Sequence, residues 1–185
     1  MSDLPEAPYE SALFKVGAKK DLTAEEVARL KATIKRVGWV ESKNDPLAVQ
    51  GIAGGGTGPG RGLFQYEALG EDGSSATAKN RLKWFEKNYG KVDLPQSDRD
   101  EMAEDVPDFT NISEDGQRAI LLADWVARTP GDQVGEVARG EMTDKDFWLD
   151  YHWAGAPNSP KKRAKKGLQW DKEMVDYARL VGGTN

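Results

Sequence analysis

The apolar residues of positions 23–43 follow a helical rhythm. They are separated by steps of three and four residues, at Val27, Leu30, Ile34 and Val37. This spacing places them on one face of an amphipathic α-helix that packs against a core. Thr23 and Glu26 have the spacing of a capping box at the start of the helix, and Pro46 prevents the helix from continuing. We therefore expect a helix from Thr23 to about Lys43.

Similar periodicity predicts helices in most of the remaining chain. They are expected at about Tyr9–Val16, Ser75–Tyr89, Ser113–Arg128, Gln133–Arg139, Thr143–Tyr151 and from Trp170 to Val181. Their core-facing residues would be Ala78, Leu82, Phe85, Tyr89, Ile120, Leu121, Trp125, Trp170, Met174, Tyr177 and Val181. Residues 91–112 are acidic and interrupted by prolines, so they should form a connection with at most a helical turn or two. Because there is no internal repeat and no long linker, we predict one mostly helical domain over residues 1–185.

A glycine-rich stretch interrupts the helical pattern. Residues 51–62 should form a loop, with a small β-ribbon in it or directly after it. Leu63–Glu67 alternates apolar with polar residues, which is typical of a half-buried strand with Gln65 and Glu67 on one face. The stretch lacks the Lys and the Ser or Thr of a phosphate-binding P-loop, and no clear strand precedes it. It therefore does not indicate a nucleotide site.

Composition narrows the chemistry that the protein can perform. Its 185 residues contain no Cys and a single His, His152. Disulfides, thiolate nucleophiles and zinc sites built from Cys or several His are excluded, and we expect no metal and no cofactor. The net charge of −5 argues against broad nucleic-acid binding. No apolar run approaches the roughly 20 residues that span a bilayer, and the N-terminus lacks the basic and apolar segments of a secretory signal.

One acid interrupts the apolar face of the first long helix. The step of four residues after Val37 reaches Glu41. Burial raises the pKa of a carboxyl group because it disfavours the charged form, and enzymes use such acids as proton donors near neutral pH. Alternatively, the helix ends early and leaves Glu41 in solvent, as is usual for Glu. The neighbouring glycine-rich loop favours the first interpretation, in which Glu41 is the general acid of a glycan-cleaving site.

Three segments around this acid resemble the motifs of soluble lytic transglycosylases and goose-type lysozymes. The first is Glu41-Ser42 at the helix end, followed by the turn Asn44-Asp45-Pro46. The second is Gly62-Leu63-Phe64-Gln65, with Phe in place of the family's usual Met. The third is Tyr151-His152-Trp153-Ala154-Gly155-Ala156-Pro157, which is similar to the family's Tyr-Asn-Ala-Gly-Pro but has one extra residue and His in place of Asn. The three segments occur in the family's order.

The resemblance implies a lysozyme-like, mainly α-helical (α+β) domain, with the glycine-rich loop and a small β-ribbon beside a peptidoglycan-binding cleft. Glu41 would protonate the glycosidic oxygen between N-acetylmuramic acid and N-acetylglucosamine. Glu67 falls where goose-type lysozymes have an acid that positions water, which would favour hydrolysis. Lytic transglycosylases instead use one Glu, and the 6-hydroxyl of the sugar attacks the anomeric carbon. The residues expected to contact the substrate are Ser42, Gln65, Tyr66, Tyr151 and His152.

Several of these residues also have a purely structural interpretation. Glu67 would then be a surface acid on a strand edge, and His152 a packed, hydrogen-bonded side chain. Trp148 and Trp153 could stack against sugar rings or belong to the core. The basic run 161–166 could be a solvated turn or helix face, or it could attract the anionic cell wall and, more weakly, nucleic acid.

These expectations define three hypotheses. The first, which we favour, is a muramidase or lytic transglycosylase that cleaves the glycan strand of bacterial peptidoglycan, as a phage endolysin or virion-associated lysozyme does. The second is an endopeptidase or amidase that cuts the peptide crosslinks on the same fold; the lack of Cys and of several His makes its mechanism harder to assemble. The third is a non-catalytic wall-binding or virion structural protein. Under the first hypothesis we expect a monomer that reaches the wall from the host cytoplasm or is carried by the virion.

Overall fold

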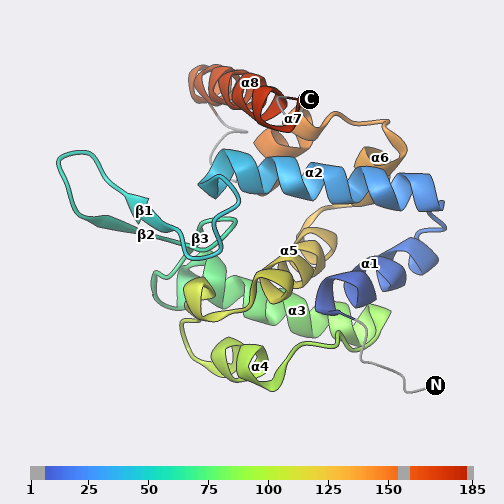
Figure 1. The fold of residues 1–185 in the computed structure, drawn as a ribbon. Coiled ribbons are helices and arrows are strands. Elements are labelled where there is room, and N and C mark those ends of the chain that lie inside the picture. The colour runs from blue at the N-terminus through green and yellow to red at the C-terminus, as the bar shows by residue number, and fades with distance from the viewer. Residues whose placement is uncertain (1–6, 154–158, 183–185) are drawn as a thin grey trace.

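The protein is mainly helical and carries one small β-sheet. The computed structural model describes residues 7–153 and 159–182. Helices α2, α5 and α3 form the body, and the sheet extends from one side of it (Figure 1). This arrangement confirms the mainly helical class predicted from the sequence, with a β-ribbon in the glycine-rich stretch. Within the described residues, no helix has both the length and the apolar character needed to cross a membrane.

Helix α2, Ala24–Ser42, forms as its sequence predicts. The hydroxyl of Thr23 accepts a hydrogen bond from the Glu26 backbone N–H at 3.2 Å, and the Glu26 carboxylate accepts one from the Thr23 N–H at 2.7 Å. This capping box satisfies N–H groups that the first turn leaves without helical partners. The apolar stripe is buried: Leu30, Ile34 and Val37 are at most 1% exposed. The helix ends at the left-handed Lys43 and directs its last turn, with Glu41, toward the sheet.

Helix α5, Glu114–Arg128, is the central element of the core. It packs against α1, Pro8–Lys19, on one side and α3, Ser74–Tyr89, on the other. Its N-terminus is capped by Ser113, whose hydroxyl accepts from the Gly116 N–H at 3.1 Å. The segment Ile120–Trp125 is fully buried. Because α5 is buried on nearly all sides, its polar residues also lie in the interior. One of them, Asp124, lies near the C-terminal end of the helix and is fully buried.

The remaining helices are short, apart from the last. They are α4 Gln96–Ala103, α6 Gln133–Arg139, α7 Asp144–Phe147 and α8 Pro160–Gly182, with 3₁₀ turns at Gly70–Asp72 and Phe109–Asn111. Helix α7 continues directly into a π-helical turn, Trp148–His152. The segment 91–112 contains α4 and one 3₁₀ turn, which is more helix than the turn or two predicted, because Pro95 directly precedes α4 and Pro107 follows it, so neither interrupts it. The helix expected from Thr143 is confirmed, since the Thr143 hydroxyl accepts from the Asp146 N–H at 3.1 Å.

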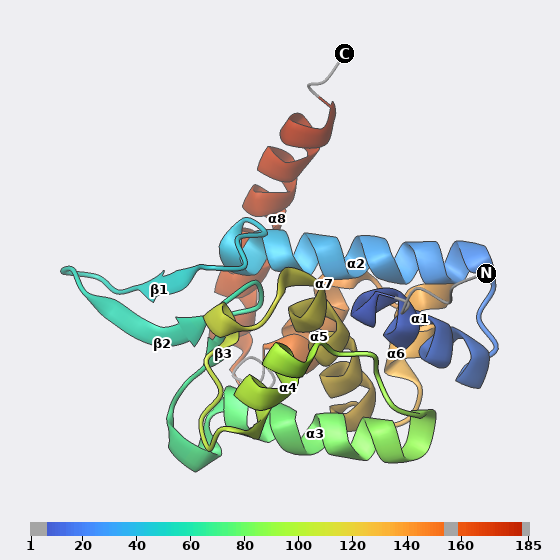
Figure 2. The ribbon, with the colours of Figure 1, turned by 60° about the horizontal axis from the view of Figure 1, so that its bottom comes forward.

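The sheet has three short antiparallel strands in the order β1-β2-β3. These are β1 Val49–Gly51, β2 Thr57–Arg61 and β3 Tyr66–Glu67. The β1–β2 hairpin projects from the helical body (Figures 1 and 2). Residues 54–56, at its tip, all have positive φ, between 88° and 103°, which only glycine adopts readily. The glycine run therefore serves the turn of a hairpin.

The strand predicted over Leu63–Glu67 is wrong for all but its last two residues. Residues 62–65 form a turn, and Gln65 has a left-handed φ of 53°. The cause is a distant contact: the Leu63 N–H donates to the side-chain carbonyl of Gln117, on α5, at 2.7 Å. Because the turn intervenes, Gln65 and Glu67 do not share one face of a strand.

The last helix begins earlier than predicted. It starts at Pro160 instead of near Trp170, because proline fits the first turn of a helix, where its missing N–H has no partner to lose. Trp170 is buried and Met174 and Tyr177 are half-buried, but Val181 is 52% exposed. The burial predicted for Val181 is therefore wrong. The end of α8 projects beyond the helical body (Figure 2), and about half of Val181 stays exposed there.

The turn that replaces the predicted strand depends on Gly62. This residue has φ +74°, and a Cβ there would lie 2.3 Å from the Gln117 side-chain oxygen. We expect Gly62→Ala to cost about 1–3 kcal/mol and to lower the melting temperature by about 2–12 °C in thermal unfolding followed by circular dichroism. Gly51→Ala is the control, because a Cβ at Gly51 meets no atom within 4 Å. Equal melting temperatures for the two variants would contradict this role of Gly62.

Candidate functional site

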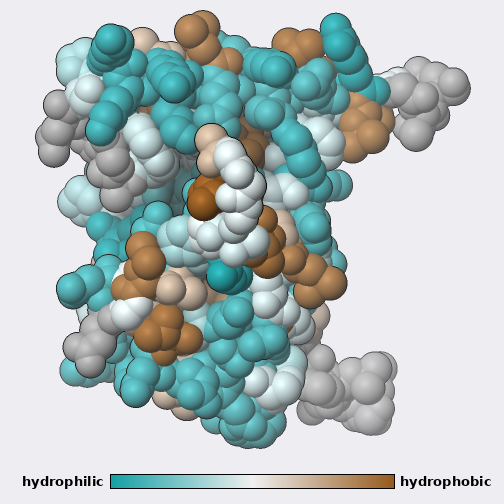
Figure 3. Space-filling model, turned by 90° about the vertical axis from the view of Figure 1, so that its left-hand side faces the viewer, coloured by the Kyte–Doolittle hydropathy of each residue, from teal (hydrophilic) through white to brown (hydrophobic). Residues whose placement is uncertain are grey.

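A cleft of about 340 Å³ opens where the C-terminal ends of α2 and α5 meet the sheet and the π-helical turn. The residues that line it are Glu41, Phe64, Gln65, Tyr66, Glu67, Ser74, Arg128, His152 and Trp153. They come from five separate segments of the chain, so only the folded protein assembles them. On the face that bears the hairpin, apolar surface gathers around the projecting loop (Figure 3). The exposed apolar side chains in and next to the sheet are Leu47, Val49, Ile52 and Leu69.

Glu41 is an acid held in a poorly hydrated place. Its side chain is 18% exposed, and its Oε1 accepts a hydrogen bond from the Trp148 indole N–H at 2.7 Å. Burial raises the pKa of Glu41 above its ordinary value, although the Trp148 hydrogen bond and the charge of Lys166 act in the opposite direction. Glu41 therefore holds its proton to a higher pH than a solvent-exposed glutamic acid does.

The π-helical turn brings two polar ring atoms to this carboxyl group. Trp148 begins the turn and His152 ends it. The Trp148 ring is 1% exposed and packs against Trp170 at 5.4 Å between ring centroids. His152 Nε2 lies 3.7 Å from the same Oε1 of Glu41. Single π-helical turns are rare in proteins, but those that occur are often at functional sites. In this protein the turn places His152 in the wall of the cleft.

Helix α5 supplies a buried polar cluster behind the cleft. Asp124 has no exposed surface, and its carboxylate accepts hydrogen bonds from Arg81 at 2.8 Å and from the Tyr66 hydroxyl at 2.7 Å. Arg128 Nε lies 3.2 Å from the same carboxylate. Burial, followed by the negative charge of Asp124, raises the pKa of Tyr66 well above its ordinary value. Tyr66 therefore donates its hydroxyl hydrogen to Asp124, while its ring stacks on Phe109 at 4.2 Å.

The structure brings most of the predicted site residues together. Glu41, Gln65, Tyr66, Glu67 and His152 all line the cleft. The Gln65 amide also donates to the Gly62 carbonyl at 2.9 Å, which holds the turn of residues 62–65. Glu67 is exposed, and its backbone N–H donates to the Ser74 hydroxyl at 2.6 Å.

Two predicted substrate contacts lie elsewhere. Ser42 and Tyr151 are not among the described residues that line the cleft. The Ser42 hydroxyl donates to the Leu63 carbonyl at 2.8 Å, so it ties the end of α2 to the turn of residues 62–65. The Tyr151 ring packs against Phe147 at 5.6 Å between centroids. Both side chains therefore contact residues next to the cleft and do not line it. The rest of the third motif, Ala154–Pro157, lies outside the described residues.

Sequence reasoning missed the partners that α5 contributes. It placed Trp125 in the core and did not single out Asp124 or Arg128. A signal was present, because Asp124 interrupts the apolar run Ile120–Val126 just as Glu41 interrupts its own stripe, and Arg128 follows at the i+4 position. A charged pair inside an apolar helix indicates a buried polar cluster.

The basic run 161–166 forms the first turns of α8. Arg163 forms ion pairs with Asp146, at 3.1 Å, and with Asp150. The Lys166 ammonium lies 4.9 Å from the centre of the Trp153 ring, which lines the cleft. Both of these side chains thus take part in local packing, and Lys166 adds positive charge near the cleft.

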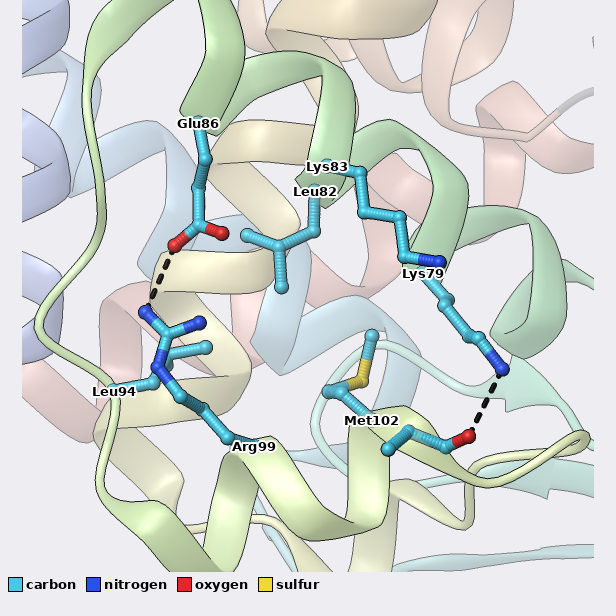
Figure 4. Close-up of a pocket in the computed structure, with 8 residues that line it drawn as sticks. Lys79, Leu82, Lys83, Glu86, Leu94, Arg99 and Met102 are labelled. Atoms are coloured by element: carbon cyan, nitrogen blue, oxygen red, sulfur yellow. Dashed lines mark hydrogen bonds and ion pairs between the residues drawn. The ribbon is translucent and has the colours of Figure 1, made fainter.

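A second cavity, of about 330 Å³, lies between α3 and α4 (Figure 4). Its apolar floor is formed by Leu82, Leu94 and Met102. Its one acid, Glu86, pairs with Arg99 at 2.8 Å, and Lys79 donates to the backbone carbonyl of Ala103 at 3.1 Å. The Glu86 carboxylate is thus already bound to a guanidinium within this cavity.

No protein-family model, curated protein or solved structure matches the chain. Within residues 7–153 and 159–182, no group of three or more His, Asp or Glu side chains is arranged to hold a metal ion. The functional conclusion therefore depends on the geometry of the cleft and on the motifs in the sequence.

Proposed function

We propose that the protein cleaves the glycan strand of bacterial peptidoglycan, with Glu41 as the general acid, on a lysozyme-like scaffold. The observation that carries the proposal is the Glu41 carboxyl group, which lines a cleft with the dimensions of a small-molecule site and whose pKa is raised by burial. Its position in the Glu-Ser motif, with the turn of residues 62–65 across the cleft, matches the resemblance to lytic transglycosylases and goose-type lysozymes.

The hydrogen bond from Trp148 indicates which oxygen delivers the proton. Because the indole N–H donates to Oε1, that oxygen acts as an acceptor, and the acidic hydrogen is favoured on Oε2. In the reaction, Oε2 would protonate the bridging oxygen as the bond from this oxygen to the anomeric carbon breaks. The Glu41 carboxylate would then take a proton from the attacking hydroxyl group, which restores the acid.

Two reactions share this first step and differ in the nucleophile. If water attacks, the product has a reducing muramic end; if the 6-hydroxyl of the same muramic acid attacks, the product is a 1,6-anhydro sugar. Glu67 lines the same cleft as Glu41 and is exposed, so it has access to water. We propose hydrolysis in which Glu67 positions that water.

The products of purified peptidoglycan test the proposal. Mass spectrometry should show reducing muramic ends, and Glu67→Gln should lower their rate of formation by about 10²-fold, because it removes the carboxylate that positions the attacking water. Anhydro ends that form at the same rate in Glu67→Gln would instead indicate transglycosylation by Glu41 alone. New free peptide amines with intact glycan would contradict glycan cleavage and support an endopeptidase or amidase.

A further inference from the structure

His152 has two donors directed at one of its ring nitrogens. Nδ1 accepts a hydrogen bond from the Trp125 indole N–H at 3.0 Å, and a terminal nitrogen of Arg128 lies 3.2 Å from the same atom. An indole and a guanidinium can only donate. Nδ1 must therefore be an acceptor, and in the neutral ring the hydrogen is on Nε2.

The surroundings keep this ring neutral. The His152 side chain is 8% exposed, and burial, followed by the adjacent Arg128 charge, lowers the pKa of His152 well below its ordinary value. A neutral ring with hydrogen on Nε2 and two donors on Nδ1 has no free lone pair. It cannot act as a general base in the cleft.

Helix α5 fixes the orientation of the ring independently of Glu41. Trp125 and Arg128 lie on this helix, and Asp124 holds Arg128 from behind through the contact between Asp124 Oδ2 and Arg128 Nε. Arg128 also donates to the His152 backbone carbonyl at 3.3 Å. Ring and backbone of His152 are thus held by one helix, and Nε2–H is directed toward Glu41.

The distance between His152 Nε2 and Glu41 Oε1 favours a contact with the deprotonated form of Glu41 over one with the protonated form. Nε2 is 3.7 Å from Oε1, too far for a hydrogen bond to a neutral acid. Once Glu41 has given up its proton, its negative charge attracts the N–H, and charge-assisted hydrogen bonds are shorter and stronger. The Trp148 N–H already donates to the same oxygen, so two donors would then share the charge.

We propose that His152 is a positioning residue whose Nε2–H stabilises the Glu41 carboxylate formed after proton transfer, with Trp125 and Arg128 fixing the tautomer that makes this contact. This inference rests on the proposed function of Glu41 as the general acid. His152 would act after Glu41 has protonated the bridging oxygen and before Glu41 takes a proton from the attacking hydroxyl group. Arg128 and Asp124 of α5, Lys166 of α8, and Tyr66 and Glu67 of β3 are the other charged or titratable groups around the site.

Because His152 is the single histidine, selective ¹⁵N-histidine labelling reports on one imidazole. We expect the spectrum of the neutral Nε2–H tautomer at pH 6.5, where an ordinary histidine is half protonated. The Nε2 signal should also shift as Glu41 titrates, and Glu41→Gln should abolish this shift. An imidazolium near neutral pH, an Nδ1–H tautomer, or the same shift in Glu41→Gln would overturn the inference. The experiment needs no substrate, so it is independent of whether the protein cleaves glycan.

Two substitutions separate the contact from a structural role. The amide nitrogen of Gln can reach the position of Nε2, whereas that of Asn reaches only the position of Nδ1. We expect His152→Asn to lower kcat by about 10–100-fold, because the Glu41 carboxylate loses a hydrogen-bond donor. The same loss raises the pKa of Glu41, so the basic limb of the pH profile should move to higher pH. His152→Gln should recover most of kcat. Equal losses in the two variants, or full activity in both, would contradict the role, and melting temperatures identify a variant that fails to fold.

Discussion

Replacing Glu41 with Gln should lower the rate of glycan cleavage by about 10²–10⁴-fold, the contribution typical of a general acid. Gln keeps the size of the side chain and an oxygen that can accept from the Trp148 indole N–H, but it has no acidic proton. The expected loss is therefore in kcat, with KM nearly unchanged. The measurement is the initial rate of release of soluble fragments from labelled peptidoglycan.

Folding supplies the control for Glu41→Gln. The folded-state pKa of Glu41 is raised by burial, so the negative charge is disfavoured in the folded protein. Its stabilising contribution is present at low pH and is lost as the pH rises through the folded-state pKa. Above that pKa, Gln should match or exceed the stability of the wild type. Wild-type clearing of cell walls by a folded Glu41→Gln variant would end the assignment of the general acid.

Replacing Asp124 with Asn should be the most damaging change to stability outside the apolar core. The carboxylate has no exposed surface and holds the guanidinium groups of Arg81 and Arg128. Removing one partner of a buried ion pair leaves the other charge buried without compensation, which costs about 3–5 kcal/mol. For a chain of this length, this corresponds to a fall in melting temperature of roughly 6–20 °C.

Asp132→Asn is the matched control for this substitution. Asp132 also binds two cations, Lys20 at 2.6 Å and Arg139 at 2.8 Å, but its side chain is 44% exposed. Exposed ion pairs contribute about 0–1 kcal/mol each, so the loss of two should lower the melting temperature of this variant by less than about 8 °C. If the two variants lose the same stability, burial does not determine the strength of the Asp124 cluster.

The parts of the fold that local sequence determines were predictable. The capping box and apolar stripe of α2 depend on residues within a few positions of one another, and they gave its bounds within one residue. The same stripe identified Glu41, because an acid at a core-facing position is visible without knowledge of the fold. The glycine-rich segment and the start of α5 near Ser113 were predictable for the same reason.

The features that the sequence did not predict depend on contacts between residues that are distant in the chain. Leu63 appeared to begin a strand, but its N–H bonds to Gln117, 54 positions away. The π-helical turn that places Trp148 and His152 against Glu41 has no local pattern, since its geometry follows from packing against α2 and α5. The residues that orient His152 lie on α5, and only the folded chain reveals which ring nitrogen they bind.

The most direct test is a measurement of the Glu41 pKa in the full-length protein. ¹³C-labelled glutamate side chains can be titrated by NMR, and the Glu41 signal is assigned by its absence from the Glu41→Gln spectrum. We predict that this carboxyl group titrates above 4.5, the ordinary value for glutamic acid. A Glu41 that titrates at or below this value would carry no proton under working conditions, and it would contradict glycan cleavage by acid catalysis.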